Sequence, residues 1–250
     1  MKLRHLDLFS GIGGFSLGLE SAGLVDTVAF CDFDKYCKLV LKNHWEHVPI
    51  YDDVKELNYE RLRADGIISD DKGIDIITGG YPCQPFSVAG RKKGEEDPRH
   101  LWPEYFRLVK ELRPTWVIGE NVGGHIKLGL DSVLSDLESE GYSARTFSIS
   151  AASIGANHKR ERVWILANSK SSNRNEYEIN KEHGEPETQK IFGDRGCLSG
   201  VSSRWKVEPD VGRVADGLPN TMDRLKSLGN SVVPQIPYLI ADCIRRIEGI

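Results

Sequence analysis

The chain has 250 residues, of which 39% are hydrophobic and 28% are charged, a balance typical of one globular domain with or without a small appendage. No apolar run approaches the ~18 residues of a membrane span, and the segment from Met1 to Asp7 lacks the apolar core of a secretory signal, so we expect a cytoplasmic protein without membrane contacts. The formal net charge of −4 argues mildly against a nucleic-acid ligand, unless basic residues gather on one face.

Short apolar runs alternate with segments of helical period as far as residue 167. In chain order the pattern predicts a strand at 6–9, a helix at 15–22, a strand at 27–31, a helix at 34–44, a strand at 74–78, a helix at 103–112, strands at 115–118 and 162–167, and a terminal helix over 236–247. Strands that alternate with helices predict a parallel α/β sheet.

The composition changes after Ala167. From Asn168 to Gly200 most residues are Ser, Asn, Glu, Lys or Gly, and few are hydrophobic. Such a segment reads as an irregular or partly disordered insert, because it cannot bury enough apolar surface to form a core. We therefore divide the chain into a core at 1–167, a polar insert at 168–204 and a C-terminal segment at 205–250.

The first strand runs into a glycine turn, Ser10-Gly11-Ile12-Gly13-Gly14, ahead of a helix. Such a turn lets backbone N–H groups approach a ligand closely, and Asp32, after the second strand, could accept the hydroxyls of a ribose. Neither feature is specific, since tight turns also use these glycines and Asp32 could be an ordinary helix cap. Together they favour a nucleoside-containing cofactor modestly.

Cys83 stands out among the five cysteines, which form no Cys-x-x-Cys pair and so suggest neither a zinc site nor a disulfide framework. It lies between Pro82 and Gln84-Pro85 just after a predicted strand, so its thiol is held on a stiff turn at a strand end, where α/β sheets bind ligands. Glu120 follows the next strand. Adjacent strand ends would bring Cys83 and Glu120 into one cleft.

These motifs resemble those of the cytosine-5 DNA methyltransferases. The segment at 208–217 (Glu-Pro-Asp-Val-Gly-Arg-Val-Ala-Asp-Gly) resembles phage and prophage members of that family. Four of the motifs occur in the family's order: residues 7–14 (Asp-Leu-Phe-Ser-Gly-Ile-Gly-Gly), 82–87 (Pro-Cys-Gln-Pro-Phe-Ser), 120–122 (Glu-Asn-Val) and 229–232 (Gly-Asn-Ser-Val). The resemblance covers residues 3–167 and about 205–247. It implies a Rossmann-like methyltransferase fold, with helices on both faces of a mostly parallel sheet and a short irregular target-recognition insert.

The resemblance implies a reaction in which a methyl group passes from S-adenosylmethionine to carbon 5 of a flipped-out cytosine in duplex DNA. Cys83 matches the nucleophile that adds to carbon 6, and Glu120 matches the carboxyl that contacts ring nitrogen 3. Arg160 and Arg162 match arginines that contact the flipped nucleotide, whereas His158 stands where the family has glutamine. Residues 87–100, which include the basic triplet at 91–93, resemble a loop that closes over DNA.

The family also implies a set of cofactor-binding residues, and no metal. They are Phe9, Ser10, Gly11, Ile12, Gly13, Gly14, Asp32, Asp53, Gly80, Pro82, Asn230 and Ser231. Asp53 is the weakest match, because Asp52 precedes it where a glycine is common.

Three alternatives stay open at this point. A tRNA cytosine-5 methyltransferase uses the same motifs, and a flavin or nicotinamide oxidoreductase could use the first glycine turn. A DNA-binding relative without activity is the third, although every catalytic position is filled. We expect a monomer that acts on duplex DNA, with or without a cognate restriction endonuclease, and the polar insert does not reveal the target sequence.

Overall fold

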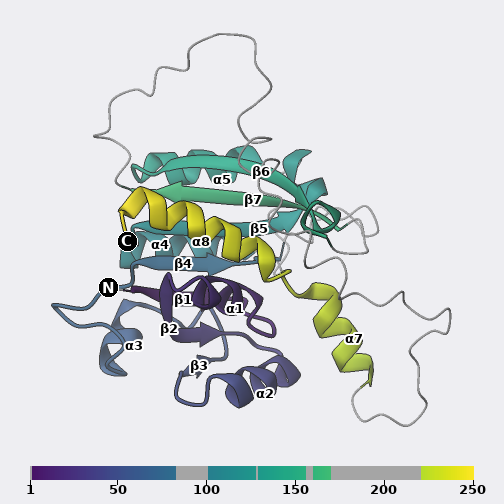
Figure 1. Cartoon of the computed structure of the whole chain (residues 1–250). Coiled ribbons are helices and arrows are strands. Elements are labelled where there is room, and N and C mark those ends of the chain that lie inside the picture. The colour runs from purple at the N-terminus through teal and green to yellow at the C-terminus, as the bar shows by residue number, and fades with distance from the viewer. Residues whose placement is uncertain (1, 83–100, 128, 156–159, 170–220) are drawn as a thin grey trace.

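The computed structural model describes residues 2–82, 101–127, 129–155, 160–169 and 221–250, and Figure 1 shows them as a layered α/β arrangement. Its strands are β1 (Leu3–Leu8), β2 (Val25–Cys31), β3 (Ile50–Tyr51), β4 (Ile76–Gly79), β5 (Trp116–Val122), β6 (Ser143–Ser150) and β7 (Glu161–Asn168). Its α-helices are α1 (Gly14–Ser21), α2 (Lys35–His44), α3 (Tyr59–Ala64), α4 (Trp102–Leu112), α5 (Leu130–Ser139), α7 (Thr221–Asn230) and α8 (Gln235–Glu248). Two short 3-10 helices, η3 (Gly123–Lys127) and η4 (Ala151–Ile154), follow β5 and β6.

The strands form one sheet in the order β3-β2-β1-β4-β5-β7-β6. The pairs from β3 to β5 are parallel, whereas β7 runs antiparallel to both β5 and β6. The predicted mostly parallel α/β sheet is therefore confirmed. The simpler expectation of parallel strands throughout does not extend to β7, which follows β6 through the short η4 and so returns in the opposite direction.

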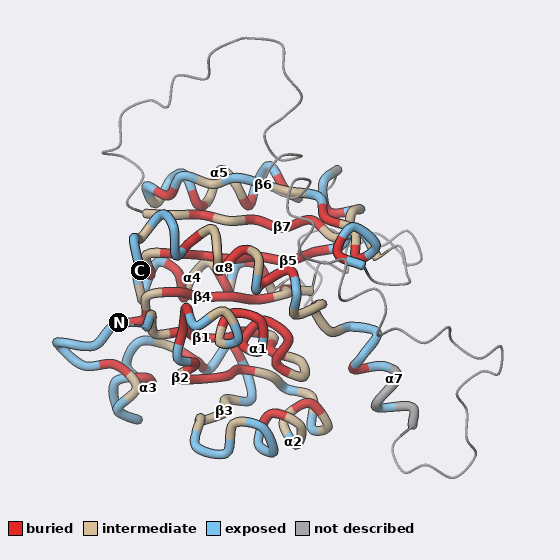
Figure 2. Tube along the Cα trace, viewed as in Figure 1, coloured by how far each residue is buried: buried red, intermediate tan, exposed pale blue. Residues whose placement is uncertain are grey.

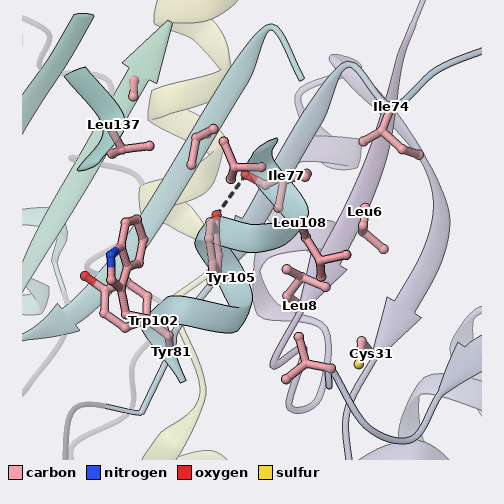
Figure 3. Close-up of a cluster of buried hydrophobic side chains, with 14 of the residues drawn as sticks. Leu6, Leu8, Cys31, Ile74, Ile77, Tyr81, Trp102, Tyr105, Leu108 and Leu137 are labelled. Carbon is pink, nitrogen blue, oxygen red and sulfur yellow. Dashed lines mark hydrogen bonds between the residues drawn. The ribbon is translucent and has the colours of Figure 1, made fainter. Parts of the chain in front are cut away.

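Helices cover both faces of the sheet. Ile77 and Val117 face a cluster that includes Tyr105 of α4 (Figure 3), whereas Ile76 and Ile118 face a second cluster built on α1 and α8. Because successive residues of a strand point to opposite faces, strands covered on both sides must be apolar at nearly every position. Figure 2 shows the central strands buried along most of their length.

The C-terminal helix packs on the first helix. A Cβ atom at Gly18 of α1 would lie 2.3 Å from the carbonyl oxygen of Pro234 and 2.8 Å from Cβ of Pro237. The absence of a side chain at Gly18 therefore sets how closely α8 approaches α1. Ile236 and Ile240 of α8 complete the cluster on this face.

Several elements differ from the expectations. β5 extends to Val122 instead of ending at residue 118, because β7 pairs with it as far as Arg162. α5 and β6 were not expected, and β6 is an edge strand in which only Ile149 is buried, so it lacks an apolar run. Short β3 and α3 also went unpredicted. Among the described residues, no helix is both long enough and apolar enough to cross a membrane.

Candidate catalytic and cofactor site

The glycine turn after β1 has a backbone that ordinary residues rarely adopt. Phe9, Gly11 and Gly13 all have positive φ, at 51°, 54° and 84°. Positive φ is unusual for a bulky residue such as Phe9, and it marks a turn that its surroundings hold in place. Ser10 supplies part of that hold, since its hydroxyl donates to the Asp7 carbonyl at 2.5 Å and accepts from the Cys31 N–H at 3.2 Å.

Asp32 lies at the end of β2 and contacts this turn directly. Its carboxylate accepts the Gly11 N–H at 2.7 Å through one oxygen and the Asp34 N–H at 2.8 Å through the other. Burial raises the pKa of Asp32, and these two hydrogen bonds oppose the rise. The cap of α2 is Asp34, which accepts from two N–H groups of the first turn, so Asp32 is not the helix cap.

Phe33 was not among the predicted site residues. It follows Asp32 and is 75% exposed, an unusual degree for a large aromatic ring. The sequence signal was available, because an aromatic residue stands directly beside the predicted ribose acceptor.

Asp53 lies near the same edge of the sheet. The Asp32 N–H donates to the Tyr51 carbonyl at 3.0 Å, which joins the ends of β2 and β3 just before Asp53. Asp53 is exposed, and one of its carboxylate oxygens accepts the Lys55 N–H at 2.9 Å. Asp52 differs, since it forms an ion pair with Lys38 at 2.5 Å.

The segment before α8 returns to the glycine turn. A Cβ atom at Gly14 would lie 2.6 Å from the carbonyl oxygen of Val232 and 3.2 Å from Oγ of Ser231. Trp45 packs against the neighbouring Gly13, since its ring atoms would lie 2.7 Å from a Cβ atom there. The structure therefore brings Ser231, and Asn230 next to it, to the start of α1.

Glu120 occupies a buried position on β5. It is 8% exposed, and its Oε1 lies 3.0 Å from Nε of Arg162. The strand register explains the ion pair, because Arg162 of β7 is opposite Val122, two residues beyond Glu120. Burial raises the pKa of the Glu120 carboxyl, and the positive charges of Arg162 and Arg160 limit the rise.

Arg160 stands next to this ion pair. Burial lowers the pKa of its guanidinium, and so does the charge of Arg162, whereas Glu120 opposes the change. Its Nη1 donates to the carbonyl of Leu228 in α7 at 3.5 Å. Arg160 thus lies between the Glu120 carboxyl and the C-terminal segment.

The residues leading to Cys83 pass close to Glu120. A Cβ atom at Gly80 would lie 3.1 Å from Oε2 of Glu120, and the side-chain amide of Asn121 donates to the Tyr81 carbonyl at 3.1 Å. Gly80 and Tyr81 thus lie beside β5, and Pro82, the next residue, is half-buried.

Several predicted residues lie outside the described part of the chain. They are Cys83, the loop at 87–100 with its basic triplet at 91–93, His158, and residues 170–220, which include nearly all of the polar insert.

A buried polar network beneath the turn also escaped prediction. Ser16 and Thr78 donate to the two carboxylate oxygens of Asp7, each at 2.8 Å. Because the Thr78 hydroxyl donates to Asp7, it accepts from Nε2–H of His5, which lies 2.8 Å away. The other ring nitrogen of His5 then accepts from Thr27 at 3.1 Å. The network ties β1 to β2, to β4 and to α1.

Comparison with solved structures places this fold. A DNA modification methyltransferase encoded within an E. coli prophage superimposes with a TM-score of 0.58 at 31% identity, covering 68% of this chain and 47% of that one. The S. pombe Dnmt2 methyltransferase superimposes with a TM-score of 0.64 over 98% of this chain and 99% of that one. At 18% identity the second match speaks for the fold alone.

Sequence relatives include bacterial type II methyltransferases. M.HgiCII of Herpetosiphon aurantiacus is 34% identical over 170 residues, which cover 66% of this chain and 37% of that protein. M2.BsuMI of Bacillus subtilis is 32% identical over 197 residues, which cover 74% of this chain and 46% of that protein. The chain thus spans less than half of the length of each of these relatives.

The sequence model of the C-5 cytosine-specific DNA methylases matches residues 3–204, which is most of the chain. The match includes the glycine turn, the proline-framed cysteine, and the strand that carries Glu120. By this match, together with the relatives and the fold, the chain belongs to the C-5 cytosine-specific DNA methylase family.

Proposed function

We propose that this chain methylates carbon 5 of cytosine in duplex DNA, with S-adenosylmethionine as the methyl donor. The observation that carries the proposal is the Glu120 carboxyl, which is buried, paired with Arg162, and packed against Gly80. Gly80 leads within three residues to Cys83, the family's nucleophile position. A carboxyl and a thiol on adjacent strand ends suit addition to a pyrimidine ring.

The residues around the glycine turn fit the donor. When bound, S-adenosylmethionine supplies an electrophilic methyl group on a sulfonium centre. Asp32 can accept ribose hydroxyls, because each carboxylate oxygen has a second lone pair beyond its hydrogen bond to the backbone. The exposed ring of Phe33 can stack on a purine. Around Gly11 a Cβ atom would meet nothing within 4 Å, so the backbone there is open to a ligand.

We assign the cofactor to the predicted residues with Phe33 added. They are Phe9, Ser10, Gly11, Ile12, Gly13, Gly14, Asp32, Phe33, Asp53, Gly80, Pro82, Asn230 and Ser231. Support for the last two comes from the contact of Ser231 and Val232 with Gly14.

The chemistry divides between Cys83 and Glu120. The Cys83 thiolate adds to carbon 6 of cytosine, which makes carbon 5 nucleophilic, and the thiolate leaves after carbon 5 has been methylated and has lost its proton. Glu120, with its pKa raised by burial, can hold a proton and donate it in a hydrogen bond to ring nitrogen 3. Arg162 fixes the orientation of that carboxyl through the contact of 3.0 Å, and Arg160 lies beside it.

The proposed partner is duplex DNA. The target cytosine must flip out of the base stack to reach the site. In the three-part division, the core at 1–167 and the segment at 205–250 build the catalytic and cofactor site. We assign site preference to the polar insert at 168–204, because the rest of the chain is accounted for by that site. This partner and division suit a monomer that acts in the cytoplasm.

The test of the activity is methyl transfer from labelled cofactor to duplex DNA and, in parallel, to tRNA. We expect label in DNA only, located on carbon 5 of cytosine, and covalent trapping of Cys83 by duplexes that contain 5-fluorocytosine. Cys83→Ser should lose transfer and trapping while retaining binding of cofactor and DNA. Label in tRNA alone, or full activity in the serine variant, would refute the proposal.

The test of the cofactor is thermal stabilisation. S-adenosylmethionine at 100 times its Kd should stabilise the fold by about 2.7 kcal/mol. Asp32→Ala should lose most of this gain because it removes the ribose acceptor. Asp26→Ala is a matched control, since Asp26 is an exposed residue of the same strand β2. Stabilisation by NAD in place of S-adenosylmethionine would move the chain to another class of enzyme.

A further inference from the structure

Tyr81 is held at both of its ends, by a residue of β5 and by a residue of the 3-10 helix η3 that follows β5. Its carbonyl accepts from the side-chain amide of Asn121 at 3.1 Å, and its hydroxyl lies 2.9 Å from Nε2 of His125. Tyr81 and His125 are 2% and 3% exposed. Asn121 is the next residue after Glu120, and His125 lies in η3, which continues β5.

The aromatic surroundings fix the ring of Tyr81 as well. Its centroid is 5.0 Å from that of Trp102, the first residue of α4, and 5.5 Å from that of His125 (Figure 3 shows Tyr81 beside Trp102). A Cβ atom at Gly119 would lie 3.3 Å from Cε1 of Tyr81, so the ring packs directly on the backbone of β5. Tyr81 has little freedom to shift along or away from that strand.

Backbone geometry carries this restraint toward Cys83. The hydrogen bond from Asn121 orients the planar peptide that joins Tyr81 to Pro82. The ring of Pro82 then fixes its own φ, so only ψ of Pro82 separates that peptide plane from the next one, which contains the Cys83 nitrogen. The position of Tyr81 therefore sets much of the direction in which the chain leaves Pro82.

We propose that His125 is a positioning residue, which acts through the Tyr81 hydroxyl to place the nucleophile relative to Glu120. Asn121 belongs to β5, which also carries Glu120, and His125 lies in η3 directly after it. The same strand would therefore position both the Glu120 carboxyl and, through Tyr81, the backbone that leads to Cys83. This assignment rests on the proposed methyl transfer and adds to it a residue that contacts neither the base nor the cofactor.

Tyr105 offers a matched comparison inside the same cluster. Its hydroxyl is also fully buried, but it donates to the backbone carbonyls of Ile77 and Ile118 at 3.2 and 3.1 Å. Tyr105→Phe thus removes a buried hydroxyl, with its cost in stability, without touching the path from His125 to Pro82. A structural role alone predicts that Tyr81→Phe and Tyr105→Phe behave alike.

The experiment measures single-turnover methyl transfer to DNA, the rate of trapping by 5-fluorocytosine, and KM for both substrates. A nucleophile displaced by a fraction of an ångström reacts more slowly, so His125→Ala and Tyr81→Phe should each lower kcat and the trapping rate by about 10-fold, with KM little changed. The double variant should be no slower than either single variant, because both changes break the same contact. His125→Gln, which keeps a hydrogen-bonding group, should recover part of the rate.

Tyr105→Phe should keep the wild-type kcat and trapping rate while its Tm falls. The assignment is overturned if His125→Ala retains the wild-type kcat, or if Tyr105→Phe slows transfer as much as Tyr81→Phe does. An inactive wild-type protein would refute the proposed function itself, so the two failures are distinguishable.

Discussion

Gly80 and Glu120 lie so close that a methyl group on Gly80 would come within 3.1 Å of Oε2 of the carboxylate. Such a contact is tighter than side chains normally make, so the carboxyl would have to move by a few tenths of an ångström. Gly80→Ala should therefore reduce kcat by about 10-fold or more, because the displaced group is the one that would contact the base. Steady-state kinetics check this, and Gly73→Ala, where a Cβ would meet nothing within 4 Å, should match the wild type.

Glu120→Gln should separate activity from stability. Burial raises the pKa of Glu120 in the folded state, because the charged carboxylate is less stable there than in water. The fold is therefore most stable with Glu120 protonated, and it loses stability as pH rises through the folded pKa. The glutamine variant mimics the protonated form and avoids this cost. Its Tm should exceed that of the wild type at pH 8, and the gap should close near pH 4, while methyl transfer falls by at least about 10²-fold. Thermal melts at both pH values test this, and a lower Tm at pH 8 would contradict it.

Gly18→Ala should loosen the C-terminal helix from α1. The new Cβ atom would lie 2.3 Å from the carbonyl oxygen of Pro234. Because this neighbour is a backbone atom, relieving the clash requires a shift of the chain before α8 or of α1. Overpacking of this kind should lower the free energy of unfolding by about 1–3 kcal/mol, which urea denaturation would measure. Leu17→Ala is the control, since Leu17 is the neighbouring residue of α1 and is 50% exposed. Equal losses in both variants would argue against the contact.

Asp7 and His5 should oppose each other in the pH dependence of stability. Burial raises the pKa of Asp7 from 3.8 to about 7, so its contribution to stability is lost as pH rises between these values. Burial lowers the pKa of His5 from 6.5 to about 3, so its contribution is lost as pH falls over much of the same range. The two effects should largely cancel in the wild type.

Asp7→Asn should leave the pH dependence that His5 contributes to stability without the opposing contribution of Asp7. Relative to the wild type, the variant should gain stability as pH rises from 3.8 toward 7, by a few kcal/mol in all. Chemical denaturation at a series of pH values measures the difference, and exposed Asp26→Asn supplies the control. A difference between variant and wild type that stays flat across this range would show that burial does not raise the pKa of Asp7.

The sequence predicts β1, β4 and β5 because strands buried on both faces must be apolar. It does not predict β6, an edge strand in which all residues but Ile149 are exposed or half-buried, because such a strand lacks this pattern. The length of β5 beyond residue 118 depends on its pairing with β7, and tertiary pairing of this kind has no local signal.

The candidate site likewise contains residues that short sequence motifs predict and contacts that only the folded structure reveals. Motifs identify Glu120, Asp32 and the glycine turn, because each carries its chemistry in a short run of residues. Whether Asp32 caps α2 or contacts the turn is decided only by the structure, in which Asp34 is the cap and Asp32 accepts the Gly11 N–H. The contact of Tyr81 with His125 joins positions 44 residues apart through the register of two strands, so no local pattern reveals it.

The packing of α8 on α1 bears on how the protein is made. Arg245 of α8 donates to the carbonyl of Ala22, which lies 223 positions earlier in the sequence, and Val232 lies against Gly14 at the other end of α1. A ribosome releases the N-terminal helix long before the segment that covers it. The nascent chain must therefore expose the apolar face of α1 throughout most of synthesis, and closing so long a loop makes late folding steps slow. This face of α1 is therefore an apolar surface that a chaperone could bind during synthesis.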